Sequence, residues 1–314
     1  MIETWILTHA DNLQISLFFG FFVVFMVTER YIPKRPGVQQ RTRRWSTNLL
    51  LTAFSLVVLF LLPVTFFGVA VWAQERGLGL LNCTPLPLGI LIVGTLLARG
   101  FISFSTHYLV HKVPVFWTVH RVHHLDTELD VSSTVRFHPL EFPLNLLLGI
   151  PQVIFFGLTP WVQLVYEILD ATITVFSHAN IRMPRNADRF LRYLIVTPDL
   201  HRVHHSAWQP ETNSNFGAVF PFWDLVCGTF HTDTRDSPET MELGLSEVRD
   251  ARTEQIHWLL ISPWVKVGWE NEAMKMSGLQ SNHLSRDCQP QLKRSARRWD
   301  TVRSHGSKGK SLIA

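Results

Sequence analysis

The sequence predicts an all-α protein. We expect a polytopic bundle of membrane helices, with about four spans or two spans plus hairpins, under a cytoplasmic helical cap that carries paired histidines. Only 17% of the 314 residues are charged while 46% are hydrophobic, which is a low charge content for a water-soluble protein. The uncharged residues come in long blocks, which indicate membrane helices from about 18 residues upward. Histidines recur three or four residues apart, the spacing of one helix face.

Three apolar blocks occupy the first third of the chain. The first covers residues 13–27, and we interpret it as a retained anchor because the N-terminus lacks the positive region of a secretory signal. Residues 49–73 carry no charge, and residues 86–106 carry a single one, Arg99. The second and third blocks are long enough to cross a membrane as helices.

A further apolar stretch predicts a helical hairpin. Residues 142–166 are uncharged, and the apolar character continues to Phe176. Pro151, Gly157 and Pro160 interrupt this stretch. Because such residues end or kink helices, we predict two helices that meet near residues 157–160.

The basic residues predict how the chain is oriented in the membrane. Six of them lie in the loop after the first block: Arg30, Lys34, Arg35, Arg41, Arg43 and Arg44. The positive-inside rule places this loop in the cytoplasm. The third block and the hairpin then both end at the cytoplasmic boundary, and all the paired histidines share that face. We expect a multi-pass integral membrane protein, of a bacterial inner membrane rather than of the endoplasmic reticulum.

Nine of the fifteen histidines follow a pattern that predicts a metal site. They are His107, His111, His120, His123, His124, His178, His201, His204 and His205. At this spacing a helix aims two or three imidazoles in one direction, and neutral imidazole is the commonest metal ligand among side chains. The segments His120-Arg-Val-His-His124 and His201-Arg-Val-His-His205 repeat one another, which chance does not explain.

The number of histidines predicts two metal ions. Nitrogen-only ligation suits zinc, copper, iron or nickel, and a closed zinc site takes about four ligands, fewer than are present here. With two ions, adjacent residues such as His123 and His124 serve different ions. The three cysteines, Cys83, Cys227 and Cys288, form no C-x-x-C pair, so neither a zinc ribbon nor an iron–sulfur cluster is expected.

The chain resembles the membrane-bound fatty acid hydroxylase and sterol desaturase superfamily. Beside the paired histidines, the matching pieces are Arg136-Phe-His-Pro-Leu-Glu141, Ser177-His-Ala-Asn180, Asn213-Ser-Asn-Phe-Gly217, Trp223-Asp224 and Gly228-Thr-Phe230. The resemblance covers about residues 90–231. It implies a non-haem di-iron oxygenase that uses two Fe ions, O₂ and two external electrons to hydroxylate or desaturate a membrane lipid. Sterols, fatty acyl chains and amino-acid-containing lipids are all substrates within the superfamily.

The resemblance also suggests a tenth ligand. Several members carry a second histidine four residues before the position of His178, where this chain has Thr174. The H-P-x-E segment recurs in the sterol-acting branches, and we therefore expect His138 to supply the missing ligand.

Acidic residues are expected behind the ligands, because a ligating histidine normally donates its second N–H to a carboxylate or a carbonyl. The candidates are Glu128, Asp130, Glu141, Asp170, Asp199 and Asp224. Arg99 precedes His107 by eight residues and Asp170 precedes His178 by eight, so each charge lies about 12 Å deeper in the membrane. Because charges inside a membrane are usually paired, we predict an Arg99–Asp170 contact, with Glu167 as the rival partner.

These expectations divide the chain into three parts. Residues 1–85 form membrane anchor helices, residues 86–235 a hydroxylase-like di-metal domain, and residues 236–314 a basic, partly disordered extension with an amphipathic stretch near residues 256–264. The sequence has neither a cytochrome b5-like H-P-G-G nor a flavin fingerprint. We therefore expect a separate cytochrome b5-like or ferredoxin-like electron donor, and no nucleic-acid partner.

Two other classes of protein remain open on the sequence. One is a membrane metal-binding or transport protein, although transport sites tend to lie near the bilayer midplane on broken helices. The other is a zinc-dependent hydrolase, although the H-E-x-x-H of the commonest zinc proteases is missing.

Overall fold

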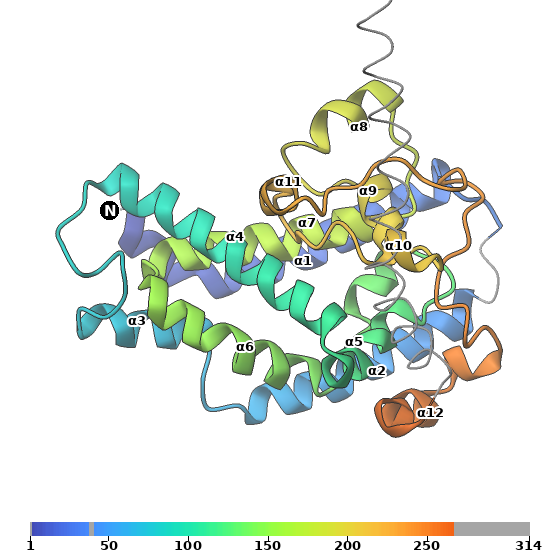
Figure 1. Cartoon of the computed structure of the whole chain (residues 1–314), viewed down its shortest axis with the longest axis horizontal. Helices are drawn as coiled ribbons and strands as arrows, with labels where there is room; N and C mark the ends of the chain where they lie inside the picture. Colours follow the sequence, from blue (N-terminus) through green and yellow to red (C-terminus); the bar gives the residue numbers. More distant parts are fainter. Residues whose placement is uncertain (1, 38–40, 267–314) are drawn as a thin grey trace, which may run out of the picture. The chain divides into compact units, whose positions relative to one another are not determined.

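Helices form the whole of the regular structure in the described residues, 2–37 and 41–266 of a computed structural model. There are twelve α-helices and three 3-10 turns in this part of the chain, and its only β-pairing consists of isolated bridges. The predicted all-α class is therefore confirmed (Figure 1). Residues 1–265 form one compact unit. Of the predicted basic extension, residues 236–314, the part from residue 267 onward lies outside the described residues.

Three segments of the described chain are long and apolar enough to cross a membrane: Asn12–Tyr31, Arg41–Glu75 and Leu88–Lys112. The first belongs to helix α1 (Ile2–Tyr31) and the third is helix α4 (Leu88–Lys112). Large apolar side chains such as Phe19 and Phe60 are more than half exposed on these segments. Such surfaces suit contact with lipid rather than with water.

The second apolar block differs from the single helix that its composition predicts. It forms helix α2 (Arg41–Leu61) and the separate helix α3 (Phe66–Glu75). Pro63 lies between them and cannot continue the α2 hydrogen-bond ladder, because proline has no backbone N–H. The Thr65 side chain then accepts a hydrogen bond from the Gly68 N–H and caps the start of α3.

The predicted hairpin is confirmed as helices α6 (Glu141–Phe156) and α7 (Pro160–His178). Gly157 ends α6 with a φ of 67°, a backbone conformation that glycine adopts readily. A Cβ atom at this position would lie 2.6 Å from the Leu78 carbonyl oxygen. The turn therefore requires glycine at position 157, because the neighbouring loop leaves no room for a side chain there. Pro151 lies inside α6 without ending it.

Four helices carry the histidines to one end of the bundle. Helices α4 and α7 end near His111 and His178, and helices α5 (Pro114–His124) and α9 (Pro198–His204) lie beside those ends. In Figure 1 this region is opposite to the labelled N-terminus. Helices α8 (Arg185–Leu191), α10 (Gln209–Thr212) and α11 (Phe222–Cys227) belong to the segment that surrounds α9.

A buried ion pair fastens α2 to the segment that follows α5. The Arg44 Nε donates to Asp126 at 2.7 Å, and its Nη1 donates to Asp130 at 3.0 Å. Burial alone would raise the pKa of Asp126, but the guanidinium groups of Arg44 and Arg136 outweigh it and hold the pKa well below its ordinary value. Asp126 is therefore an anion, and Arg44 balances its charge within the fold.

The segment after residue 236 packs against the histidine-bearing helices. Arg136 Nη2 donates to the Thr253 carbonyl at 2.7 Å, and Thr47 donates to the Glu254 carbonyl at 2.7 Å. The amphipathic stretch forms helix α12 (Ile256–Ile261) and the 3-10 turn Ser262–Trp264. Its Trp258 and Leu259 are buried while Trp264 is 70% exposed.

We predict that Asp126→Ala strongly destabilises the fold. It leaves the buried Arg44 cation without its main partner, a change that typically costs about 3–5 kcal/mol. The apparent Tm of the purified protein in detergent should fall well below that of the wild type. Asp250→Ala is the control, because Asp250 forms an exposed pair with Arg252 and pairs of that kind add little stability. Equal Tm values for the two variants would refute the structural role of Arg44.

Candidate metal centre

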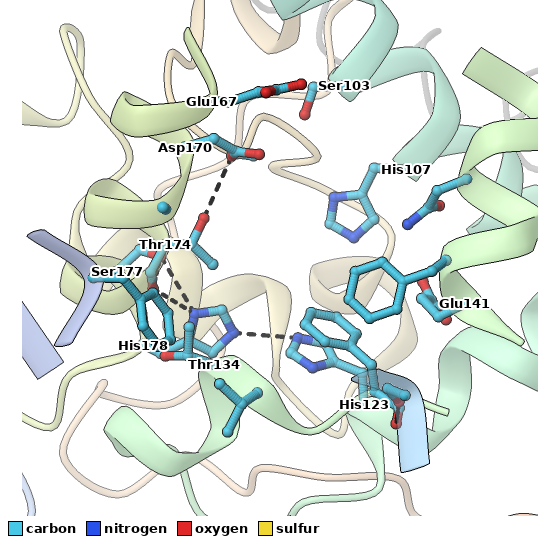
Figure 2. A pocket seen from close by; sticks show the side chains of 18 of the residues that line it. Ser103, His107, His123, Thr134, Glu141, Glu167, Asp170, Thr174, Ser177 and His178 are labelled. Carbon is cyan, nitrogen blue, oxygen red and sulfur yellow. Dashed lines mark hydrogen bonds between the residues drawn. The ribbon is translucent and has the colours of Figure 1, made fainter. Parts of the chain in front are cut away.

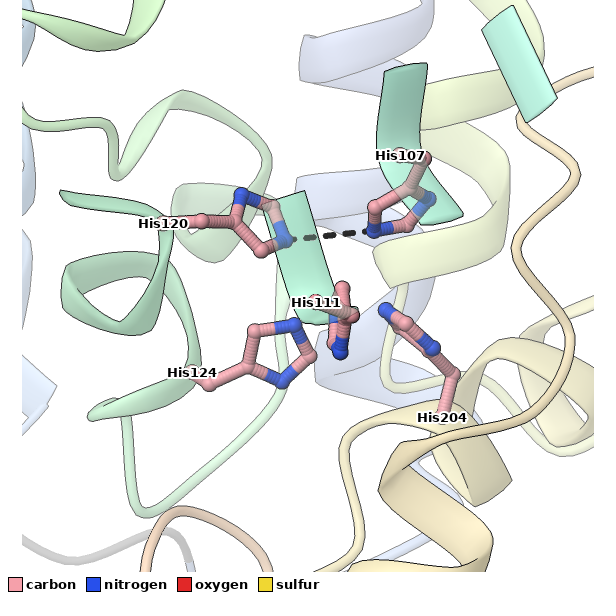
Figure 3. Close-up of side chains that lie close together, drawn as sticks. All are labelled: His107, His111, His120, His124 and His204. Atoms are coloured by element: carbon pink, nitrogen blue, oxygen red, sulfur yellow. Dashed lines mark hydrogen bonds between the residues drawn. The ribbon is translucent and has the colours of Figure 1, made fainter. Parts of the chain in front are cut away.

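The nine patterned histidines form two neighbouring groups. We call His107, His111, His120, His124 and His204 the five-histidine group, shown in Figure 3. We call His123, His178, His201 and His205 the four-histidine group. Within each group, one nitrogen of every imidazole lies within 4.8 Å of those of all the others. The two groups adjoin, since the rings of His124 and His205 stack with their centroids 4.5 Å apart.

Helical spacing explains how each repeated segment serves both groups. On α5, His120 and His124 are four residues apart and face the five-histidine group, while His123 faces the other. On α9 and the residue after it the roles are exchanged. His201 and His205 face the four-histidine group, and His204 faces the five-histidine group. The adjacent residues His123 and His124 thus lie in different groups, as two separate ions would require.

Distances between imidazole nitrogens fit shared ions. His107 Nε2 lies 3.1 Å from His120 Nε2, and His178 Nε2 lies 3.2 Å from His123 Nε2. His201 Nε2 lies 3.1 Å from the Nε2 atoms of both His178 and His205. Two nitrogens that bind one ion at about 2.1 Å are separated by about 3.0–3.4 Å, for octahedral to tetrahedral angles. The nitrogens thus already have the separations that a common ion imposes.

Oxygen atoms behind the ligands fix the orientation of five of the rings. The Nδ1 atoms of His107, His178 and His204 lie 2.8, 2.8 and 2.7 Å from the carbonyl oxygens of Phe216, Thr174 and Ser214. His123 Nδ1 lies 3.2 Å from the Arg136 carbonyl oxygen, and His120 Nδ1 lies 2.7 Å from Glu141 Oε1. Each oxygen accepts the Nδ1 proton, so the Nε2 lone pair of each ring points into its group.

Several other nitrogens of the two groups are buried without a hydrogen-bond partner in the described part of the chain. They are both ring nitrogens of His111 and of His124, Nδ1 of His201 and of His205, and Nε2 of His204. Buried polar atoms of this kind are costly unless something satisfies them. Metal ions would satisfy those that face the group interiors, and the residues therefore fit a metal centre.

Burial favours the neutral form of several of these imidazoles. It lowers the pKa of His204 to about 3, against an opposing hydrogen bond to the Ser214 carbonyl. It also lowers the pKa values of His124 and His205 well below their ordinary value, and the neighbouring histidines lower them further. Neutral imidazole is the form that binds a metal.

His138 lies outside both groups, contrary to its expected role as a tenth ligand. Its Nε2 lies 3.1 Å from the Leu260 carbonyl oxygen, and its Nδ1 accepts a hydrogen bond from the Leu140 N–H at 3.1 Å. Both ring nitrogens are therefore occupied, and neither lone pair is left for an ion. The two groups together contain nine histidines rather than ten.

The acidic candidates behind the ligands divide into different roles. Glu141 alone among them contacts a ring of the two groups, that of His120. Asp224 accepts hydrogen bonds from the Phe216 and Gly217 N–H groups, both at 2.7 Å, and so holds the turn whose carbonyl faces His107. Asp199 pairs with Lys34 at 2.8 Å instead of with a histidine.

Two further candidates are engaged elsewhere. Asp130 caps the 3-10 turn Val131–Val135 and pairs with Arg44. The carbonyl oxygen of Glu128, rather than its carboxylate, accepts a hydrogen bond from Arg44 at 3.1 Å. Neither residue therefore orients an imidazole.

The expected Arg99–Asp170 contact is not formed between these two described residues. The Arg99 guanidinium lies over the rings of Phe66 and Tyr166, 5.2 and 4.8 Å from their centroids. Asp170 Oδ1 accepts a hydrogen bond from Thr174 at 3.4 Å. Both side chains nevertheless line the same cavity, which agrees with the predicted common side, although the direct pair is not formed.

Sequence reasoning missed the backbone carbonyls that orient four of the nine rings, because a carbonyl carries no residue-type signal. It also missed Arg44 and Lys34 as buried partners of acidic residues. Both residues belong to the basic loop after the first apolar block, from which only the orientation of the chain in the membrane is predicted.

A cavity of about 700 Å³ reaches both histidine groups from between α1, α2, α4, α6 and α7. His107 and His120 of the five-histidine group line it, as do His123, His178 and His201 of the four-histidine group. Figure 2 shows His107, His123 and His178 around this space. Much of the remaining wall is apolar, including Phe18, Phe22, Ile102, Phe137 and Phe142. An apolar chain would fit with one end at the histidines.

Comparison with known proteins agrees with this site. Residues 92–229 match the family described as fatty acid hydroxylase. The matched residues hold all nine histidines, and the resemblance expected over residues 90–231 is confirmed. No solved structure matches the chain.

The relatives act on several kinds of lipid. Ornithine lipid hydroxylase OlsE of Rhizobium tropici is 31% identical over 160 residues, which are 51% of this chain and 47% of that protein. Alkylglycerol monooxygenase of Homo sapiens is 25% identical, over 58% of this chain and 41% of its own length. Methylsterol monooxygenase 2-2 of Arabidopsis thaliana is 24% identical, over 72% and 89%. The chain thus spans less than half of the first two relatives. By their names, these relatives are oxidoreductases.

We predict that acid destabilises the metal-free protein. Burial lowers the folded-state pKa of His204 to about 3, while an unfolded histidine titrates near pH 6.5. Below about pH 6.5 the unfolded chain therefore binds more protons, so stability is complete above that pH and declines as the pH falls toward 3. The apparent Tm of the chelated protein should fall between pH 7.5 and pH 5. His257→Ala, at an exposed position, should retain this decline, and a flat Tm profile of the wild type would contradict the burial of neutral imidazoles.

We also predict that Glu141→Gln weakens metal binding by about 10- to 100-fold, as losses of a residue behind a ligand typically do. The amide still accepts a hydrogen bond from His120 but no longer carries the charge that raises the basicity of the ring. Competition with a chelator measures the metal affinity. Glu239→Gln is the matched control, because Glu239 is paired with Lys34 away from the histidines. Unchanged affinity in Glu141→Gln would show that this carboxylate does not support a ligand.

Proposed function

We propose that the protein is a multi-pass membrane oxidoreductase that uses O₂ and two iron ions to oxidise a C–H bond of a membrane lipid, by hydroxylation or by desaturation. The observation that carries this proposal is the pair of histidine groups at the end of the apolar cavity. Bound there, the iron ions would supply the activation of O₂ that attack on an unactivated C–H bond requires.

The ligand set supports iron over zinc. The five-histidine group has one imidazole more than a closed tetrahedral zinc site uses. Imidazole-rich sites suit iron as well as zinc and copper, and a larger coordination number favours iron among these. The match of residues 92–229 to the fatty acid hydroxylase family supports the same choice.

The residues of the chain hold the site in a form ready for metal binding and shield it from water. Glu141 and the carbonyl oxygens of Phe216 and Ser214 hold protons at Nδ1 of His120, His107 and His204, so that each Nε2 stays available. Eight of the nine imidazoles are buried. The cavity lining places an apolar substrate beside both groups while excluding solvent.

The cellular setting is proposed from the charge pattern. The segments long enough to span a membrane and the basic loop between α1 and α2 support a cytoplasmic site. Electrons are proposed to come from a separate cytochrome b5-like or ferredoxin-like protein. The lipid relatives support a membrane lipid as the substrate, and they divide between sterol and glycerol- or amino-acid-containing lipids by name.

Metal analysis of single variants tests the two-ion proposal. We expect two iron ions per chain in the wild type. Each single variant, His123→Ala or His124→Ala, should retain about one, because these neighbours belong to different groups. Combining the two changes should remove both ions. Lipid oxidation in the presence of O₂ and an electron source should be lost in all three variants. His257→Ala, an exposed histidine outside the groups, should retain two ions and full activity.

Two outcomes would contradict the proposed function. One is an active wild-type protein that carries stoichiometric zinc and hydrolyses its substrate, which would favour the hydrolase class. The other is a protein that binds two ions yet oxidises no lipid and moves metal across vesicles, which would favour transport.

A further inference from the structure

A short helix that follows the last paired histidines packs against the middle of a membrane-spanning segment. Trp223 of α11 donates a hydrogen bond from its Nε1 to the Leu97 carbonyl oxygen at 3.0 Å. Its ring centroid lies 5.0 Å from that of Phe101. Both partners belong to α4, the span Leu88–Lys112. Helix α11 therefore lies at the side of α4 rather than beyond its end (Figure 1).

The length of α4 gives the depth of this contact. A hydrocarbon core about 30 Å thick takes about 20 helical residues, and α4 has 25. Every stretch of about that length within Leu88–Lys112 contains Leu97 and Phe101. These two residues therefore lie inside the core wherever α4 is placed along the membrane normal. Helix α11 has six residues and extends about 9 Å, so all of it stays near this level.

A contact with a second helix supports the same placement. The ring of Phe220, just before α11, lies 6.2 Å from the ring of Tyr166 on α7. A Cβ atom at Gly100 of α4 would lie 3.5 Å from Trp223 Nε1 and 3.9 Å from the Tyr166 ring. Both aromatic side chains thus approach α4 at the level of Gly100. The segment that leads into α11 is held against the middle of the bundle by α4 and α7 together.

The outer face of α11 is apolar and exposed. Phe222, Leu225 and Val226 are 42, 43 and 60% exposed, and Cys227 at the end of the helix is exposed as well. Leu97, the α4 residue that α11 contacts, is itself 41% exposed. The apolar face of α11 is therefore continuous with the exposed apolar surface of a span. A contiguous exposed surface of this kind indicates contact with a membrane or with another protein.

Polar atoms of the turn around α11 are satisfied within the chain. The buried Asp224 carboxylate accepts hydrogen bonds from the N–H groups of Phe216 and Gly217. It also accepts one from the Thr229 hydroxyl. The Asp224 carbonyl oxygen accepts from the N–H groups of Thr229 and Phe230. A segment in contact with acyl chains needs such internal hydrogen bonds, because the chains offer none.

Basic side chains lie on the neighbouring helix α8. The Tyr193 ring, just after this helix, lies 5.3 Å from the ring of Phe230, which follows α11. Arg185 and Arg189 of α8 are exposed, and Phe190 between them and Tyr193 is 67% exposed. Arginines beside exposed apolar side chains suit the boundary of a bilayer, where the aliphatic stem contacts lipid and the guanidinium reaches phosphate.

We propose that α11 and α8 form a second membrane contact of the histidine-bearing domain, in addition to the spans. The outer face of α11 lies among the acyl chains of the leaflet that borders the histidine groups. Arg185 and Arg189 contact the phosphates of anionic phospholipids at the surface of that leaflet. Continuity with α4 and the bordering cations favour lipid over a protein partner. The inference goes beyond the proposed oxidation and requires only that α4 spans the membrane.

A fluorescent label on Cys227 tests the contact with acyl chains. Cys83 and Cys288 are replaced by serine, and the full-length, iron-loaded protein is labelled with a nitrobenzoxadiazole group. It is then reconstituted in vesicles of phosphatidylcholine with a minority of phosphatidylglycerol. We expect emission at a shorter wavelength than in water. We also expect quenching by lipids that carry a doxyl group on an acyl chain, and little quenching by aqueous iodide.

Two other labelling positions are the matched controls, with all three native cysteines replaced by serine. Val93→Cys lies on the α4 span, where Val93 is 57% exposed, and its label should be quenched by the doxyl lipids. Glu239→Cys lies at an exposed position whose carboxylate pairs with Lys34, and its label should be quenched by iodide. The Cys227 label should behave as the Val93→Cys label does.

A label on α8 tests the role of the arginines. Emission from a label at Phe190→Cys should shift to shorter wavelength when phosphatidylglycerol is added to vesicles of phosphatidylcholine. Combining Arg185→Gln with Arg189→Gln should abolish this shift, because the attraction to the anionic surface is lost. Arg235→Gln is the control, because the Arg235 side chain is 66% exposed and lies outside α8, and it should retain the shift.

Iodide quenching of the Cys227 label, in vesicles where the Val93→Cys label is quenched by doxyl lipids, would overturn the proposal. Protection of the Cys227 label from both quenchers would overturn it equally, because a second copy of the chain or another protein would then cover α11. A lipid-dependent shift that persists in the double glutamine variant would refute the role of the arginines. Iodide quenching of the Val93→Cys label would contradict the membrane placement of α4 and the proposal with it.

Discussion

The gathering of nine imidazoles, eight of them buried, at one end of a helical bundle is the constraint on which the rest of the structure depends. Imidazoles without partners in a dry interior destabilise a fold unless something binds them. Here their nitrogens converge to separations near 3.1 Å within two groups. The C-terminal ends of α4 and α7 therefore have to lie beside α5 and α9, at the same end of the bundle. The α6–α7 hairpin returns the chain so that α7 ends at His178, and the segment of residues 251–264 packs against α2 and α5.

The surroundings of the groups are polar in a specific way. Each oriented ring has an oxygen atom behind it, and most of these oxygens are backbone carbonyls at helix ends or turns. Asp224 holds one such turn and Arg44 with Asp126 holds the segment after α5. The site thus depends on residues that hold segments of the backbone in place. The apolar cavity reaches the site from between helices α1, α2, α4, α6 and α7.

The sequence predicted the elements that follow from spacing. Helical spacing predicted that each repeated segment aims two or three imidazoles in one direction, and that neighbours such as His123 and His124 serve different ions. Uncharged length predicted α1, α4 and the α6–α7 hairpin. It did not predict the break between α2 and α3, because Pro63 lies within an otherwise continuous apolar block. Local composition therefore predicts the apolar blocks correctly, but not the number of helices that each block forms.

The errors concern contacts between distant segments. His138 carries the residue type of a ligand, but the carbonyl of Leu260, 122 residues later in the chain, occupies its Nε2. Arg99 and Asp170 line one cavity, but the Arg99 guanidinium lies over aromatic rings instead of forming the predicted pair. Neither a side chain's rotamer nor a partner's backbone atom can be read from residue spacing. These are the places where the structure adds most to the sequence.

X-ray absorption spectroscopy at the iron edge, combined with metal quantification on the same purified protein, tests the central claim most directly. The account predicts two irons per chain, both in a first shell of imidazole nitrogens at about 2.0–2.2 Å. A single iron per chain, or a first shell that contains sulfur or lacks imidazole scattering, would contradict it.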